Sequence, residues 1–163
     1  MVEIVFNAEE IARINTLAIK RNYSGEQRGF HSRTQNTSNV WHISGVAGEA
    51  AYSRYLNLPM RFEVDSTVAK MHEADVGDKF DIKTARTLEP SNLVINVDHF
   101  NESRIYCLAN THAYPNTVQL LGWQDGREIK ERAVIKIHKM HGHKIMVYYK
   151  ELLRPVEELL ILR

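Results

Sequence analysis

The sequence predicts an α+β fold in a single domain, with helices first and mostly antiparallel strands after them. Three observations lead to this prediction. Apolar residues recur at helical spacing before residue 57, and short runs rich in branched and aromatic residues follow from residue 71. The 163 residues are enough for one well-packed core and few for two. We divide the domain into an N-terminal helix and polar loop (1–39), a core (40–125), and a basic hairpin with a C-terminal helix (126–163).

Two helices are predicted in the first third of the chain. The first runs from Ala8 to about residue 22, because Asn7 is a typical N-cap, acids fill the first turn, and apolar residues recur at helical spacing. Residues 23–39 are rich in Ser, Thr, Asn, Gln and Arg, which indicates a long polar loop. The second helix spans residues 40–56, and Pro59 follows its end.

Extended segments make up most of the remaining chain. Residues 71–76 and 80–86 form two short runs separated by Gly77-Asp78-Lys79. We predict further strands at 92–97, 103–110 and 117–123, a turn at Asp125-Gly126, a second hairpin from 133–139 and 143–149, and a short helix entered through Pro155.

The connection between 71–76 and 80–86 decides which side chains share a face. With a three-residue connection, Val76 faces Phe80 and Asp75 faces Asp81, with Cβ atoms about 5 Å apart. Lys83 then projects from the same face as Asp81. A two-residue turn would send Asp81 to the opposite face, and a bulge or a longer odd-numbered loop also stays open.

Facing carboxylates repel each other unless a cation or a proton intervenes. Hard oxygen ligands of this kind suit Mg²⁺ or Mn²⁺, whereas the alternative is two exposed acids on an edge strand. Glu49 lies in the small-residue segment SGVAGEAAYSRYL, whose composition favours close packing on a sheet. A carboxylate buried there is costly unless it is paired or metal-bound; the alternative places it on the exposed side of the helix.

Glu49, Asp75 and the Asp81-Ile82-Lys83 triplet resemble the PD-(D/E)xK nuclease superfamily, and the resemblance covers about residues 44–86. It implies a restriction-endonuclease-like core, with a central mixed sheet of about four to six strands flanked by helices. The closing LRPVEELL is similar to the ends of some small phage and bacterial members. This sequence departs from the family pattern in two ways, since no proline precedes Asp75 and the spacing to Asp81 is short. Asp78 is therefore a rival to Asp75.

The resemblance implies a metal-dependent deoxyribonuclease with Glu49, Asp75, Asp81 and Lys83 as catalytic residues and 40–125 as the catalytic core. Asp75, Asp81 and the Ile82 carbonyl would hold Mg²⁺, or Mn²⁺ as a substitute, with Glu49 reaching it directly or through water. Lys83 would orient the attacking water. We expect an endonuclease, because one small domain offers no enclosing channel. The alternative is a catalytically inactive DNA-binding or protein-interaction module. A homodimer would follow a family habit.

The charge distribution favours a nucleic-acid partner, although the formal net charge is only +1. Basic residues outnumber acidic ones between 127 and 150 and between 20 and 36, and either stretch alone could be a solvated surface. Flanking an acidic metal site, they indicate contact with DNA phosphates. We predict DNA-binding roles for His31, Arg33, Lys136, Lys139 and Lys144.

Three histidines near the C-terminal end and the single cysteine are further residues of metal-binding types. His138, His141 and His143 could bind zinc, but the segment reads as a turn between basic strands, so DNA contact is favoured. Cys107, in the run IYCLA, is interpreted as a small buried hydrophobe rather than a nucleophile. No segment has the length and apolarity of a membrane span, so we expect an intracellular protein without a membrane partner. The resemblance to small phage members makes a phage origin one interpretation.

Overall fold

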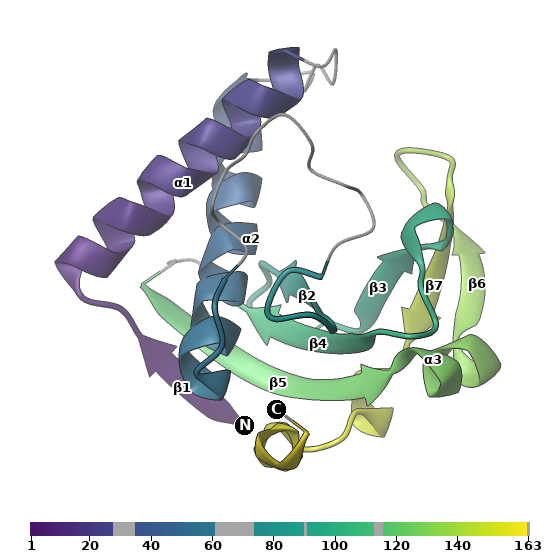
Figure 1. Ribbon diagram of the computed structural model, residues 1–163. Helices are drawn as coiled ribbons and strands as arrows, with labels where there is room; N and C mark the ends of the chain where they lie inside the picture. Colours follow the sequence, from purple (N-terminus) through teal and green to yellow (C-terminus); the bar gives the residue numbers. More distant parts are fainter. Residues whose placement is uncertain (28–34, 61–73, 90, 113–115, 163) are drawn as a thin grey trace.

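The fold combines helices with two small sheets, as a computed structural model of the chain describes it over residues 1–27, 35–60, 74–89, 91–112 and 116–162 (Figure 1). The helices are α1 (Ala8–Gln27), α2 (Gln35–Leu56) and α3 (Gly126–Arg132), with 3₁₀ turns at Val97–His99, Lys150–Leu152 and Val156–Ile161. The strands are β1 (Val2–Val5), β2 (Phe80–Ala85), β3 (Leu93–Asn96), β4 (Ile105–Asn110), β5 (Thr117–Asp125), β6 (Val134–Ile137) and β7 (Lys144–Tyr148). This content confirms the α+β class.

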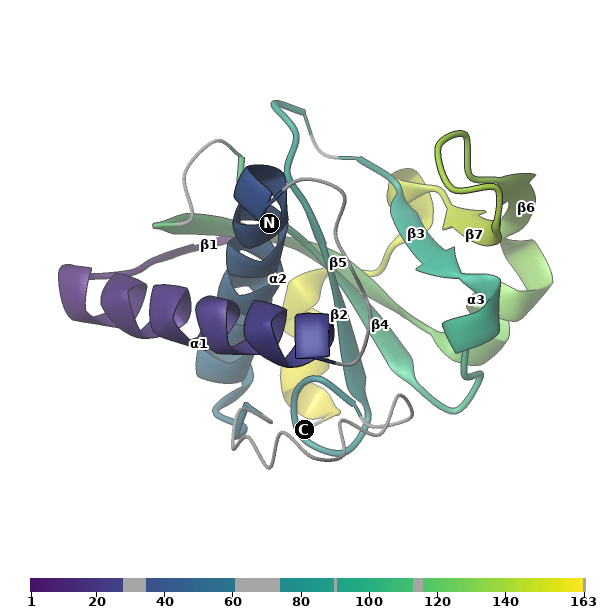
Figure 2. The same ribbon diagram turned by 90° about the horizontal axis from the view of Figure 1, so that it is seen from above.

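The first sheet is mixed and has the strand order β1-β5-β4-β2. Strand β2 pairs with β4 in parallel, whereas the other neighbours in this sheet are antiparallel. The three-stranded second sheet has the order β3-β7-β6 and is antiparallel. In the views of Figures 1 and 2, β2 lies between helices α1 and α2 on one side and the second sheet on the other.

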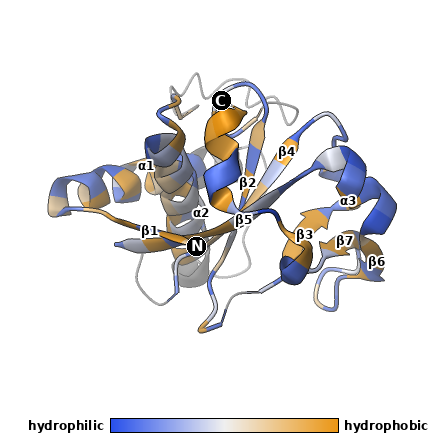
Figure 3. Cartoon of the chain, turned by 90° about the horizontal axis from the view of Figure 1, so that it is seen from below, coloured by the Kyte–Doolittle hydropathy of each residue, from blue (hydrophilic) through white to orange (hydrophobic). Residues whose placement is uncertain are grey.

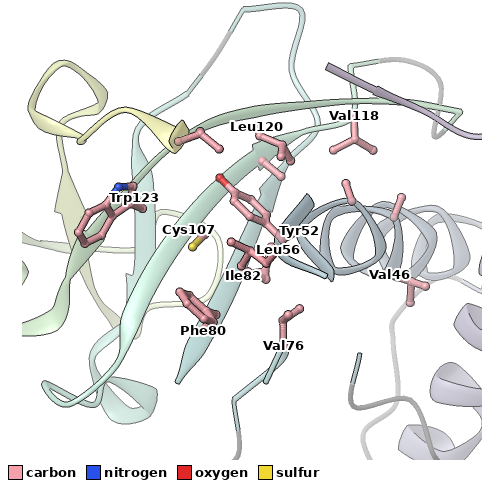
Figure 4. Packing of buried hydrophobic residues seen from close by; sticks show 14 of the residues in the cluster. Val46, Tyr52, Leu56, Val76, Phe80, Ile82, Cys107, Val118, Leu120 and Trp123 are labelled. Atoms are coloured by element: carbon pink, nitrogen blue, oxygen red, sulfur yellow. The ribbon is translucent and has the colours of Figure 1, made fainter. Parts of the chain in front are cut away.

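Helix α2 packs against the first sheet through its small residues, as its composition predicts. A Cβ added to Gly48 would lie 2.0 Å from Thr84 Oγ1 on β2, so no larger residue fits without displacement. Further along α2, the buried Tyr52 hydroxyl lies 2.9 Å from the Leu108 carbonyl oxygen of β4. Figure 4 shows side chains of α2, β2, β4 and β5 pointing into this shared core. Glu49 follows Gly48 directly, so the close approach brings Glu49 to β2.

The opposite face of the first sheet packs on the second sheet. Tyr106 and Leu108 of β4 are buried there with Ile129 of α3 and with apolar residues of β3 and β7. Figure 3 shows α3 in the hydrophilic colour and β3 in the hydrophobic colour, consistent with α3 covering the core through few residues. Asp81 pairs with Tyr106 in the β2–β4 ladder and therefore shares this second face.

Several predicted boundaries need correction. The Asn7 cap is confirmed, since Asn7 Oδ1 accepts from the Glu10 backbone N–H at 2.9 Å. The predicted loop over 23–39 is wrong at both ends, because α1 continues to Gln27 and α2 begins at Gln35. Strand β1 was not expected. Asp125-Gly126 is not a turn but the start of α3, where Asp125 Oδ1 accepts from the Glu128 N–H.

Most of the other predicted elements correspond to observed ones. Of the predicted strand at 71–76, residues 71–73 lie outside the described residues, and Val76 forms isolated bridges instead of a strand. Strands β3, β4 and β5 lie within or close to their predicted ranges, and β6 and β7 form the predicted hairpin. Pro155 caps a 3₁₀ turn rather than an α-helix. No helix in the described ranges has both the length and the apolar character needed to cross a membrane.

Candidate active site

The turn before β2 confirms one half of the predicted register and corrects the other. Val76 bridges Phe80 across a three-residue turn, in which Gly77 takes a φ of 55° that favours glycine. The backbone N–H groups of Asp75 and Val76 both donate to the Phe80 carbonyl, at 2.9 and 3.1 Å. Two residues thus oppose one, as in a β-bulge. The predicted pairing of Asp75 with Asp81 is wrong, because Asp75 and Val76 both lie opposite Phe80.

Asp75 instead reaches β2 through its carboxylate. Its Oδ2 accepts a hydrogen bond from the Ile82 backbone N–H at 2.7 Å. The carbonyls of Lys79 and Ala85 accept hydrogen bonds from Ile105 and Thr111 at the two ends of β4. Successive residues of a strand direct their backbone N–H and carbonyl groups to alternate sides. Ile82 therefore turns its N–H and carbonyl away from β4, toward what we call the outer edge of β2. Asp75 and the Ile82 carbonyl share this edge.

Asp81 and Lys83 project from the face of β2 opposite to Phe80 and Ile82, as the alternation predicts. Phe80 and Ile82 are buried in the core under α2, whereas Asp81 is 8% exposed. The Lys83 ammonium hydrogen-bonds Asp81 Oδ1. Arg104, buried just before β4, places a guanidinium nitrogen 3.5 Å from Asp81 Oδ2. Arg104 was not predicted, and its place in the tight turn before β4 carries no sequence signal for this role.

Glu49 extends from α2 to the same region and is buried, not on the exposed side of the helix. Both of its carboxylate oxygens accept from Arg21 of α1, at 2.7 and 2.8 Å. This two-point geometry is the strongest common form of a guanidinium–carboxylate pair. Sequence reasoning assigns no partner to Arg21, which is one of several basic residues between 20 and 36. The cost of burying Glu49 was the signal that one had to exist.

The pKa shifts of Asp75 and Glu49 indicate that these side chains act on one another electrostatically. Burial, followed by the charges of Glu49 and Asp81, raises the pKa of Asp75 from 3.8 to about 7. Burial also raises the pKa of Glu49, against the opposing effects of Arg21 and Lys83. Asp78 is exposed in the turn, whereas the Asp75 carboxylate accepts from the Ile82 N–H, so the geometry favours Asp75 over its rival.

The carboxylates of this set are suitable ligands for a divalent cation, although the described side chains are not arranged around a common point. Carboxylates whose mutual repulsion and burial favour protonation are the groups that Mg²⁺ or Mn²⁺ would stabilise. Yet within the described ranges no three His, Cys, Asp or Glu side chains converge as a metal-binding group. The acids are engaged by Arg21, by the Ile82 N–H and by Lys83 with Arg104. Binding a cation would require at least one exchange of partner.

The residues predicted to bind DNA are placed less completely. His31 and Arg33 lie outside the described residues. Lys136, Lys139 and Lys144 are exposed on the β6–β7 hairpin. Lys136 pairs with Ile145 and Lys144 with Ile137, so these two lysines project from opposite faces of the second sheet. They do not form a single row along one face.

The histidines at the tip of this hairpin stack on one another. The ring centroids of His138, His141 and His143 are 4.7 to 5.8 Å apart. His138 Nδ1 accepts from the backbone N–H groups of Met140 and His141, both at 3.3 Å. The alternative of a zinc site is not supported, since the three are not arranged as a metal-binding group in the described chain. Cys107 is fully buried in the core, as predicted.

Comparison of the chain with protein-family models, with curated proteins and with solved structures finds no match.

Proposed function

We propose that this protein is a metal-dependent deoxyribonuclease with a restriction-endonuclease-like core, which hydrolyses phosphodiester bonds as an endonuclease. One observation carries the proposal. Glu49 from α2, Asp75 from just before the turn, and Asp81 with Lys83 from β2 lie within electrostatic range of one another beside β2. Buried acids and a lysine grouped in this way are typical of sites that bind a cation and activate water.

Each residue has a defined role in the proposed reaction. Asp75, Asp81 and the Ile82 carbonyl would hold Mg²⁺ or Mn²⁺, and Glu49 would complete the set directly or through a water. Such a cation, when bound, lowers the pKa of a water and stabilises charge on the phosphate. Lys83 would orient the attacking water and favour loss of its proton, while Arg104 contacts the other carboxylate oxygen of Asp81. Asp81 makes no covalent bond to the substrate.

The position of the site suits a polymeric substrate. Strand β2 ends the order of the first sheet, so no further described strand continues the sheet beyond it. Helices α1 and α2 lie to one side of β2 and the second sheet to the other (Figure 2). The exposed lysines of the β6–β7 hairpin add positive charge on that second side, where phosphates flanking the cleaved bond could bind.

A second candidate function has its own supporting observation. The three acids Glu49, Asp75 and Asp81 are accompanied by three cations, Arg21, Lys83 and Arg104. A set balanced in this way would also suit a module that binds DNA or protein without turnover. The two functions differ in whether the carboxylates must hold a metal ion.

The decisive experiment is cleavage of supercoiled, linear and branched DNA in Mg²⁺, Mn²⁺ or EDTA. We expect metal-dependent cleavage by the wild type, retained in Asp78→Asn and lost in Asp81→Asn. Asp78 is the matched control, because it is an exposed aspartate three positions before Asp81. Equal cleavage by Asp81→Asn and the wild type would overturn the site, and salt-sensitive binding without cleavage would favour the second function.

A further inference from the structure

Among the described side chains, two ion pairs join α1 to α2, and they differ in kind. Arg54 contacts Glu10 through one 3.2 Å interaction between side chains that are 54% and 36% exposed. Arg21 engages both oxygens of Glu49, whose side chain is 8% exposed while that of Arg21 is 36% exposed. The first is an ordinary surface pair of small energetic value. In the second, a partly exposed guanidinium covers a buried carboxylate.

The Arg21 pair bears directly on cation binding. A guanidinium that occupies both Glu49 oxygens leaves neither fully available to a metal ion. Arg21, Lys83 and Arg104 would repel a divalent cation at this site. Moving one of these three charges away from the site would therefore favour cation binding. Arg21 is the most suitable to leave, because Arg104 is buried and Lys83 has a role at the proposed water.

Arg21 is also suited to a second partner. The planar fork that binds a carboxylate at two points binds a phosphate in the same way. Arg21 lies in the last two turns of α1. Partial burial of His42 on α2, followed by the charge of Arg21, lowers the pKa of His42. The Arg21 side chain is 36% exposed while it pairs with Glu49.

We propose that Arg21 exchanges partners during the reaction: it positions Glu49 in the absence of metal, and binds a backbone phosphate of the nucleic acid once a divalent cation takes its place. This inference rests on the proposed function. It makes Arg21 a substrate-binding and positioning residue. It also accounts for the presence of the acids without a preformed metal group.

The test measures Ca²⁺ binding by calorimetry and binding of a duplex DNA, for the wild type, Arg21→Gln and the matched control Arg54→Gln. We expect Arg21→Gln to bind Ca²⁺ about tenfold more tightly than the wild type, because a competing cation is removed. Arg54→Gln should match the wild type. Arg21→Gln should weaken DNA binding about tenfold in Ca²⁺ but not in EDTA, where Arg21 is occupied by Glu49.

The outcomes separate the two proposals. Unchanged or weaker Ca²⁺ binding by Arg21→Gln, with the wild type binding Ca²⁺, would overturn the exchange and leave the proposed function intact. An equal loss of DNA affinity with and without Ca²⁺ would do the same. Absence of Ca²⁺ binding in both proteins would overturn both proposals. If Arg21→Gln does not fold, Arg21→Lys, which keeps the charge but not the fork, should bind Ca²⁺ more tightly than the wild type by a smaller factor.

Discussion

The outer edge of β2 and the β6–β7 hairpin are both rich in charged residues, but they are built differently. At the edge, acids and bases from α1, α2, β2 and the turns before β2 and β4 are largely buried and contact one another. On the hairpin, the lysines are exposed, come from one short stretch of sequence and project from two faces. Charges that are brought together from distant segments and then buried need a specific partner, whereas exposed local charges do not.

The sharpest test of this difference replaces one lysine in each region. Lys83→Ala should reduce the cleavage rate by about 10³-fold, because the charge that we propose to act on the attacking water is lost from a partly buried site. Lys144→Ala should reduce the rate by less than about tenfold, because only a proposed phosphate contact at an exposed position is lost. Initial rates on supercoiled DNA in Mg²⁺ measure both. Similar losses in the two variants would remove the distinction between the regions.

The close contact between α2 and β2 gives the next largest effect. Gly48→Ala places a methyl group 2.0 Å from Thr84 Oγ1 and should destabilise the fold by about 3 kcal/mol. It should also lower activity, because Glu49 moves with the helix. Denaturant unfolding measures the change in stability.

Two controls belong to this prediction. Gly45→Ala meets no atom within 4 Å and should stabilise α2 by up to about 1 kcal/mol. Thr84→Ala in the Gly48→Ala background should recover much of the lost stability. If Gly48→Ala were as harmless as Gly45→Ala, the contact would not be the feature that positions Glu49.

Titration of Asp75 gives a pH-dependent effect. Its pKa is raised from 3.8 to about 7, so the folded state holds a proton that the unfolded state loses, and stability without metal falls as the pH rises through this window. Asp75→Asn keeps an oxygen acceptor for the Ile82 N–H without the charge. It should be more stable than the wild type at pH 8 in EDTA, on the order of 2 kcal/mol, and nearly equal at pH 4. Thermal unfolding at the two pH values checks this, and a variant less stable at pH 8 would contradict it.

The smallest expected effect concerns the hairpin lysines. Lys139→Ala should weaken DNA binding to a similar extent for all sequences and reduce the slope of log affinity against log salt by about 1. Lys136→Ala and Lys144→Ala should not both reduce the slope equally, because their side chains lie on opposite faces. Binding titrations at several salt concentrations measure the slopes. An unchanged slope in all three variants would make the hairpin a solvated surface.

Local features of the sequence were sufficient for much of the fold. The Asn7 cap, the small residues of α2 and the Val76–Phe80 contact depend on residues within a few positions of one another. The chemistry of Asp125 was ambiguous, since an Asp-Gly pair serves a turn as well as a helix cap.

The partners of the site residues could not be predicted in the same way. Arg21 and Glu49 are 28 positions apart, and Arg104 reaches Asp81 only because β2 and β4 pair in parallel. Nothing in the local pattern of residues 80–86 identifies β4 as the parallel neighbour on the side of β2 away from the Val76–Phe80 contact. Burial of Glu49 in a run of small residues predicted that it needed a partner, but several basic residues could have filled that role.

The most direct test of the cation site is anomalous diffraction from crystals soaked in Mn²⁺ at pH 8, where Asp75 is largely ionised. The account predicts a peak about 2.2 Å from oxygens of Asp75 and Asp81 and from the Ile82 carbonyl oxygen, with no such peak in Asp81→Asn. A crystal with Mn²⁺ at the histidines of the hairpin and none at the outer edge of β2 would contradict it.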